Sequence, residues 1–200
     1  MTAAILAGGK ARRLGGLDKT AIVVGGRSIL ERQIEALRPI AARLLLVGGR
    51  ASSTLPAGLE VVTDLVPDRG PLGGLYTALT VARETVLVVA ADLPFLDTSF
   101  LRYLTGLPSL GVDAVMPVTP DGLQPLCAVY LPSALDRVAA HLEAGRLELG
   151  GLAGDLRVLR VAPEVVSLFD PDGRMLLNVN TQADIARAEA IECKGRSNRH

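Results

Sequence analysis

The chain has 200 residues, of which 49% are hydrophobic, 21% are charged and only 3% are aromatic, and its 21 Lys and Arg balance its 21 Asp and Glu. This composition excludes an intrinsically disordered chain, and the balanced charge argues against a nucleic-acid-binding surface. One globular domain is expected over residues 1–193, with a frayed end or cloning remnant at 194–200.

The cysteines and the apolar runs predict the cellular location of the protein. Cys127 and Cys193 are too few for a disulfide framework, and no Cys/His cluster offers a zinc site, which favours a reducing, cytoplasmic location. The apolar runs are far shorter than the roughly 20 residues of a membrane-spanning helix. No membrane association is therefore expected.

Short, unbroken apolar runs at 3–7, 44–47 and 86–91 predict strands that are buried on both faces, as in a parallel sheet. Helices are predicted at 29–37, where Leu30, Ile34 and Leu37 share one helical face, and at 72–83 behind Pro71. Because strands and helices alternate, the predicted fold class is α/β, a Rossmann-like domain with helices on both faces of a mostly parallel sheet.

The second half of the chain is less regular. Strands are predicted at 114–118, 126–131 and 156–161, with a helix at 133–144. The Asp121-Gly122 pair predicts a hairpin turn, so an antiparallel excursion in the sheet is expected. Thr181, followed three residues later by Asp184, predicts the capped start of a last helix at 182–192.

A loop rich in glycine and basic residues, at 8–19, directly follows the first predicted strand. It contains Gly8, Gly9, Arg13 and Lys19, and two of the three lysines of the chain lie within it. Glycine lets backbone N–H groups approach a phosphate, and the cations would neutralise its charge. The loop alone is equally compatible with a solvated turn, because the chain has neither a P-loop motif nor a GxGxxG motif.

Three further segments are candidates for a ligand site. Asp92 follows the third predicted strand, where it would either hold Mg²⁺ together with substrate phosphates or cap a turn. The Gly-Pro-Leu-Gly-Gly stretch at 70–74 opens a helix, whose N-terminus either binds an anion or simply begins with proline. Asn178 and Asn180 either cap the last helix or contact a ligand. No Ser-His-Asp or Cys-His arrangement can be assembled, so nucleophilic acyl chemistry is not expected.

Taken together, these motifs resemble the molybdenum cofactor guanylyltransferase family over residues 3–190. The resemblance rests on Leu6-Ala7-Gly8-Gly9, Arg13-x-Gly15, Lys19, the 70–74 stretch, Asp92-Leu-Pro94, Gln124-Pro-Leu126 and Asn178-Val-Asn-Thr181. The first signature is shared with the wider nucleotidyltransferase superfamily, whereas the 70–74 and Asn-x-Asn-Thr pieces are more specific. The resemblance implies transfer of GMP from GTP to the terminal phosphate of molybdopterin, which releases pyrophosphate and forms molybdopterin guanine dinucleotide.

The resemblance also implies roles for individual residues. By motif position, the nucleotide side comprises Leu6, Ala7, Gly8, Gly9, Lys19, Asp64 and Asp92; the expected catalytic residues are Lys19, Arg13 and Asp92; and the acceptor side comprises Gly70, Gly74, Asn178 and Asn180. Asp92 matches the ligand of Mg²⁺, the implied cofactor, and Asn180 is a candidate second ligand. The implied protein partners are a molybdenum-insertion protein and apo-molybdoenzymes.

Two departures from the family pattern leave alternatives open. Val47 stands where such sequences often have asparagine, and Asp68 competes with Asp64 for the nucleotide-contacting role. The alternative functions are cytidylyl transfer to molybdopterin, guanylyl transfer to another phosphorylated acceptor, and a catalytically silent nucleotide-binding homologue.

Overall fold

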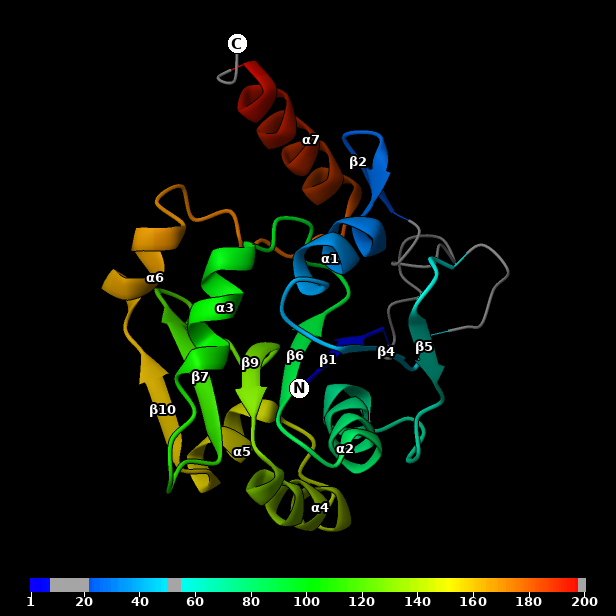
Figure 1. The fold of residues 1–200 in the computed structure, drawn as a ribbon, viewed down its shortest axis with the longest axis vertical. Coiled ribbons are helices and arrows are strands. Elements are labelled where there is room, and N and C mark those ends of the chain that lie inside the picture. The colour runs from blue at the N-terminus through cyan, green and yellow to red at the C-terminus, as the bar shows by residue number, and fades with distance from the viewer. Residues whose placement is uncertain (8–21, 50–54, 198–200) are drawn as a thin grey trace.

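A mixed eight-stranded sheet forms the centre of the computed structural model, which describes residues 1–7, 22–49 and 55–197 (Figure 1). Its parallel half has the order β6–β1–β4–β5. These strands are β1 (Thr2–Leu6), β4 (Arg43–Val47), β5 (Leu59–Val62) and β6 (Val86–Ala90). All five residues of β1 and of β6 are buried, as their unbroken apolar runs predict.

The other half of the sheet contains the antiparallel excursion. Strand β9 (Cys127–Tyr130) lies antiparallel between β6 and β7 (Ala114–Thr119), and β10 (Val158–Val161) pairs in parallel with β7 at the edge. The short β8 (Gly122–Leu123) folds back on β7 through a turn in which Gly122 has a φ of 107°. The predicted α/β class with a mixed sheet is therefore confirmed.

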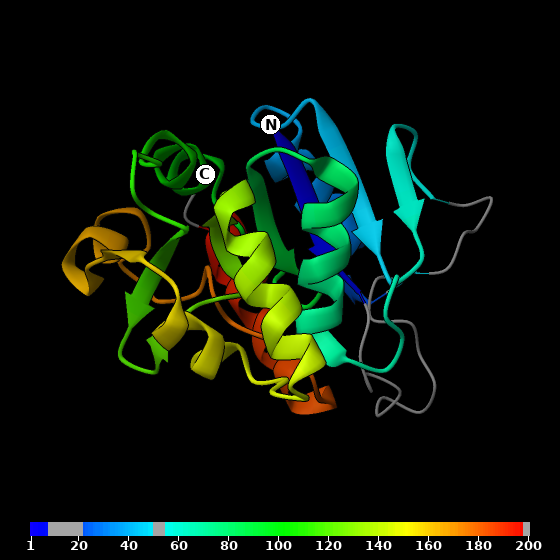
Figure 2. The ribbon, with the colours of Figure 1, turned by 90° about the horizontal axis from the view of Figure 1, so that it is seen from below.

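Helices cover both faces of this sheet (Figures 1 and 2). One face carries α1 (Ile29–Leu37), α3 (Thr98–Gly106) and α6 (Pro163–Phe169). The other carries α2 (Gly70–Ala82), a 3-10 turn (Pro132–Ala134) that leads into α4 (Leu135–Glu143), and α5 (Leu149–Asp155). Strand β1 supplies both layers, because Ala3 and Ile5 pack in the first and Ala4 and Leu6 in the second.

A small third cluster lies beside the main core, at the end of the molecule where α7 (Gln182–Ser197) meets the hairpin of β2 (Val23–Val24) and β3 (Arg27–Ser28) (Figure 1). Its buried members are Ile22, Val24, Ile29, Val179 and Ala188, and Phe95 and Ile185 pack against them. We call this cluster the satellite core. It joins segments that are far apart in the sequence.

Several element boundaries differ from the prediction. Helix α7 runs to Ser197, so the expected helix end at Glu192 is corrected. Gly195 is the only strong helix breaker there, and it costs only about 1 kcal/mol relative to alanine. Helix α2 begins at Gly70 rather than at Leu72, because Pro71 lies in its first turn.

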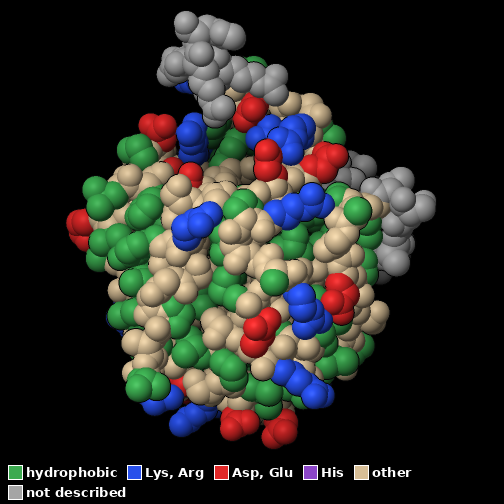
Figure 3. All heavy atoms as spheres, in the orientation of Figure 1, with side chains coloured by type: hydrophobic (Ala, Val, Ile, Leu, Met, Phe, Trp, Pro, Cys, Tyr) green, Lys and Arg blue, Asp and Glu red, His purple; other side chains and the backbone are tan. Residues whose placement is uncertain are grey.

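The surface carries both signs of charge. On the face shown in Figure 3, basic and acidic side chains are intermingled, as the balanced composition leads one to expect. None of the described helices is long and apolar enough to cross a membrane.

Candidate active site

The strand order reverses beside β1. From β1 the chain goes first to β4 and β5 on one side and then returns to β6 on the other. In open α/β sheets, ligands bind at the carboxyl ends of the strands at such a reversal. Strands β1 and β6 end in register, with Leu6 opposite Ala90, and the Ala91 N–H donates to the Leu6 carbonyl at 3.1 Å. The segments that follow these two strands therefore share one edge of the sheet.

The predicted nucleotide loop leaves the sheet at this edge. Leu6 is buried against α2, and the Ala7 N–H donates to the Val47 carbonyl at 2.9 Å. Gly8, Gly9, Arg13 and Lys19 lie outside the described residues, so their predicted roles stay predictions. The described chain resumes at Ile22, which is in the satellite core.

Val47 does not face this edge. Its side chain is fully buried in the apolar cluster beneath α2. Gly48, with a φ of 72°, and Gly49 follow it. Any contact that this segment makes to a ligand beyond β4 would come from these glycines and not from position 47.

Asp92 follows β6, separated from its last residue by Ala91, and is partly buried. Its segment is held by contacts from distant parts of the chain. The Gln33 side chain on α1 donates from Nε2 to the Ala90 carbonyl at 2.7 Å and to the Leu93 carbonyl at 3.0 Å. The Val179 N–H donates to the Asp92 carbonyl at 2.9 Å. The backbone on both sides of Asp92 is therefore fixed, which positions its carboxylate at the edge.

Sequence reasoning missed Gln33. Its only signal in the sequence is a polar side chain beside the apolar face of the 29–37 helix. Gln33 is 1% exposed, and its Oε1 is buried without a hydrogen-bond partner among the described residues.

Asp64 follows β5 at the same edge. The neighbouring Leu65 N–H donates to the Thr77 hydroxyl at 3.0 Å, and that hydroxyl donates to the Gly73 carbonyl of α2 at 2.9 Å. The Oδ1 atom of Asp64 is buried with no hydrogen-bond partner in the described part of the chain, and burial raises the pKa of its carboxyl group. Asp68 is exposed. These features distinguish the partly buried Asp64 from the exposed Asp68, and a nucleotide contact by either residue stays a prediction.

The two carboxylates, of Asp64 and Asp92, follow strands that are not neighbours. Strands β5 and β6 lie three strand spacings apart, which is roughly 14 Å. Within the described ranges, no group of three or more His, Cys, Asp or Glu side chains could hold a metal. Asp92 alone fits the mode in which Mg²⁺ uses one or two carboxylates together with substrate phosphates.

The two glycines assigned to the acceptor side both belong to α2. Gly70 opens the helix with a φ of 59°. Gly74 is buried, and a Cβ atom there would lie 3.4 Å from the methyl groups of Leu6. Such a Cβ atom would make ordinary van der Waals contact with β1, and a ligand contact by either glycine stays a prediction.

Asn178 and Asn180 are exposed on either side of Val179, which is fully buried in the satellite core. The helix cap is made by Thr181, whose hydroxyl accepts the Asp184 N–H at 3.2 Å. The Asp184 carboxylate in turn accepts the N–H groups of Asn180 and Thr181 at 2.9 and 2.8 Å, and these bonds lower the pKa of Asp184. The predicted Thr181 cap is confirmed, and a ligand contact by either asparagine stays a prediction.

A pocket of about 470 Å³ opens beside Asn178. The other polar side chains in its lining include Asp121, Gln124 and Arg187, and it also has apolar walls from β7 and α6. Gln124 donates from Nε2 to the Thr119 hydroxyl at 2.8 Å, which closes the turn between β7 and β8. The pocket has room for a small ligand next to the predicted acceptor-side residues.

Comparison with known proteins gives a consistent result. Residues 3–157 match the family described as the MobA-like NTP transferase domain. The molybdenum cofactor guanylyltransferase of Desulfosudis oleivorans is 31% identical over 197 residues, which cover 98% of each chain. The probable molybdenum cofactor guanylyltransferase of Chloroflexus aggregans is 36% identical over 95% of this chain and 94% of its own.

Solved structures agree. Molybdopterin-guanine dinucleotide biosynthesis protein A from Archaeoglobus fulgidus is similar with a TM-score of 0.83 and 30% identity, over 97% of this chain and 100% of its own. A 2-C-methyl-D-erythritol 4-phosphate cytidylyltransferase from Thermus thermophilus, with a TM-score of 0.67 and 18% identity over 95% and 98% of the two chains, shares the fold. The chain therefore belongs to the MobA-like NTP transferases and, among them, to the molybdenum cofactor guanylyltransferase family.

Proposed function

We propose that this protein transfers GMP from GTP to the terminal phosphate of molybdopterin, releasing pyrophosphate and forming molybdopterin guanine dinucleotide. The observation that carries the proposal is the edge where β1 and β6 end in register. There the chain that enters the predicted GTP loop lies beside the segment of Asp92. Relatives that are named for this activity cover nearly the whole chain.

The chemistry needs no protein nucleophile. An oxygen of the acceptor phosphate attacks the α-phosphorus of GTP, a new P–O bond forms, and the bond to the β-phosphate oxygen breaks, so that pyrophosphate leaves with the electron pair. Such a transfer depends on in-line positioning and on cancellation of negative charge. In this proposal Lys19, Arg13 and the backbone N–H groups of Gly8 and Gly9 hold the phosphates.

The strand order gives the substrates an order along the edge. Asp64 follows β5 at one end of the parallel half, the glycine-rich loop follows β1, and Asp92 follows β6. The pocket beside Asn178 is lined by residues of β7, on the other side of β6. We assign the nucleoside to the Asp64 side, the triphosphate to the loop, and the acceptor to the side of Asn178 and Asn180.

Asp92 is the residue we assign to Mg²⁺. The ion, when bound, would offset charge on the phosphates as the leaving group departs. Its carboxylate fits this role because its backbone is fixed at the sheet edge and because carboxylate oxygens suit hard cations. Asn180 is a candidate second ligand. We also propose that residues 1–193 form the catalytic domain, and that molybdopterin passes from a molybdenum-insertion protein and onward to apo-molybdoenzymes.

Nucleotide-dependent thermal unfolding and a turnover assay test this function. Unfolding is measured with GTP, CTP, ATP and UTP, each with and without Mg²⁺; ligand at 100 times its Kd adds about 2.7 kcal/mol, a shift of roughly 5–11 °C for this chain length. Of the four nucleotides, we expect only GTP to raise Tm, and Mg²⁺ to enlarge that rise. In the turnover assay, we expect pyrophosphate release with GTP and molybdopterin. A rise with CTP instead would indicate cytidylyl transfer. Binding of GTP without turnover would indicate another acceptor or a silent homologue.

A further inference from the structure

The satellite core receives one residue from each of three segments that follow or contain predicted site residues. Ile22 follows the glycine-rich loop, three residues after Lys19. Phe95 lies three residues after Asp92, and Val179 stands between Asn178 and Asn180. The chain on leaving the predicted nucleotide loop, the segment after Asp92 and the Asn178–Asn180 segment therefore all contribute to the same small cluster.

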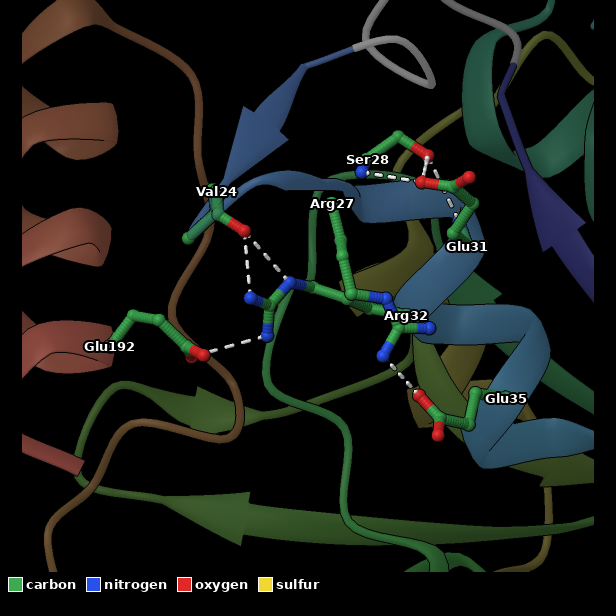
Figure 4. A network of polar contacts seen from close by, with 7 residues as sticks. All are labelled: Val24, Arg27, Ser28, Glu31, Arg32, Glu35 and Glu192. Atoms are coloured by element: carbon green, nitrogen blue, oxygen red, sulfur yellow. Dashed lines mark hydrogen bonds and ion pairs between the residues drawn. The ribbon is translucent and has the colours of Figure 1, made fainter. Parts of the chain in front are cut away.

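Beside this cluster, Arg32 of α1 links the β2–β3 hairpin to α7 (Figure 4). Its guanidinium group donates from Nε and Nη2 to the Val24 carbonyl of the hairpin, at 3.1 and 2.7 Å. From Nη1 it donates to the Glu192 carboxylate of α7 at 3.2 Å. The two side chains are only 14% and 22% exposed, so the ion pair is far less screened than a surface pair.

The approach of the hairpin to α7 is close. The Gly25 N–H donates to the Glu189 carboxylate at 2.9 Å, which adds a second link between the same two elements. A Cβ atom on Gly25 would lie 2.5 Å from Cγ of Glu192 and 2.8 Å from Nη2 of Arg32, and the φ of 61° there also favours glycine. These hydrogen bonds and the close contact at Gly25 hold the hairpin, α1 and α7 at one spacing.

We propose that Arg32 is a positioning residue for the transfer reaction, which fixes the spacing between the β2–β3 hairpin and α7, the element that follows the acceptor-side Asn178–Asn180 segment. The proposal rests on the proposed function and adds a residue that touches neither substrate. The hairpin follows the loop directly, and α7 follows the two asparagines directly, so a change in their spacing is passed to both sides of the site. Transfer requires both substrates in line, and a misplacement of about 1 Å can cost on the order of 100-fold in rate.

The test compares two arginines of the same network (Figure 4). Arg32→Met removes the side-chain link between the hairpin and α7 and leaves the Gly25–Glu189 hydrogen bond in place. Arg27→Met is the matched control, because Arg27 pairs at 2.7 Å with Glu35 of α1 at an exposed position and has no bond to the described side chains of α7. We expect Arg32→Met to lower kcat about 10- to 100-fold with GTP affinity within about 3-fold, and Arg27→Met to change neither by more than about 2-fold.

Variants of the partner side chain separate positioning from folding. Glu192→Ala breaks the same link without altering α1, and it replaces Arg32→Met if that variant is poorly folded. Glu192→Gln keeps an oxygen acceptor for Arg32, so it should recover most of the kcat that Glu192→Ala loses. Equal kcat for Arg32→Met and Arg27→Met would overturn the proposal, as would a loss confined to GTP affinity.

Amide hydrogen exchange on the full chain gives a readout that does not depend on turnover. The Val179 N–H donates to the Asp92 carbonyl. Its exchange rate should be higher in Arg32→Met than in the unmodified protein and should be unchanged in Arg27→Met. Unchanged exchange at Val179 in Arg32→Met would refute the structural link. If the unmodified protein shows no guanylyl transfer, the proposed function fails, whereas the exchange comparison still decides whether Arg32 holds the site segments together.

Discussion

Replacement of Gln33 by methionine tests whether a buried amide on α1 holds the end of β6. Methionine has a similar volume but donates no hydrogen bond, so the carbonyls of Ala90 and Leu93 lose their donor. Each buried acceptor left unpaired costs about 1–3 kcal/mol. The substitution also removes the Oε1 atom of Gln33, which is buried without a hydrogen-bond partner among the described residues, and this stabilises the variant by a similar amount for that one atom. The net loss is about 1–3 kcal/mol, or roughly 2–12 °C in Tm for a chain of this length.

The assay is thermal unfolding of Gln33→Met beside Gln182→Met, a control at an exposed position at the start of α7. The same preparations are assayed for guanylyl transfer, and we expect Gln33→Met to lose activity at temperatures where it is still folded, because the backbone around Asp92 is released. A Tm within about 1 °C of the unmodified protein, with full activity, would refute the reasoning.

A glutamate at the same position adds a pH signature. In Gln33→Glu, burial and two facing carbonyl oxygens both disfavour the carboxylate, so its pKa in the folded state is raised above the ordinary value of about 4.3. Below that value the glutamate is protonated in both states, and the variant is at its most stable relative to the unmodified protein. As the pH rises the unfolded state ionises first, so this relative stability must fall until the raised pKa is passed. A relative stability that is flat or rises with pH would contradict this account.

Three further predictions concern single positions. The Asp113 carboxylate accepts hydrogen bonds from three N–H groups of Arg157, and these bonds lower its pKa. Asp113 therefore contributes stability above about pH 4, and this stability is lost as the pH falls through the lowered pKa. Asp113→Asn should cost about 1–3 kcal/mol at pH 7, and in urea unfolding at a series of pH values it should flatten the acid side of the stability curve. For Gly74, alanine should be tolerated and valine, which would press on β1, should lower Tm. Gly25→Ala should lower Tm because its Cβ would overlap the Glu192 side chain, and an unchanged Tm would contradict the described junction.

The parts of the fold that the sequence predicts are those with a local signal. Strands β1, β4 and β6 are unbroken apolar runs with clear stops, and α1 has an apolar face that begins at the Ser28 capping box, so its predicted bounds are confirmed. Helix α5 contains three glycines in seven residues, which gives it little intrinsic helix propensity, and it is held by tertiary contacts such as the packing of Leu152 and Ala153. Strands β2 and β3 have two residues each, which is too short for any periodicity.

The residues of the candidate site also divide into those with a local signal in the sequence and those without one. The sequence predicts that the glycine-rich loop and Asp92 each follow a buried strand, because both stand directly after unbroken apolar runs, whereas the pairing of these two strands comes only from the fold. It does not predict Gln33 or Thr77, because each acts on a segment brought to it only by folding. Gln33 bonds to carbonyls 57 and 60 residues away, and Thr77 bonds to an N–H group 12 residues away. No local pattern distinguishes these two side chains from other polar residues of a helix.

Such contacts are a physical requirement of a site at this edge. The ladder of backbone hydrogen bonds ends where the strands end, yet the segments beyond must stay open to a ligand and still satisfy their buried backbone groups. A side chain from a covering helix meets this need, as Gln33 does for Leu93, and so does a distant backbone group, as Val179 does for Asp92. The residues that position the reacting groups therefore come from α1, α2 and the approach to α7, outside the motifs that bind the substrates, and their substitution should change turnover more than nucleotide affinity.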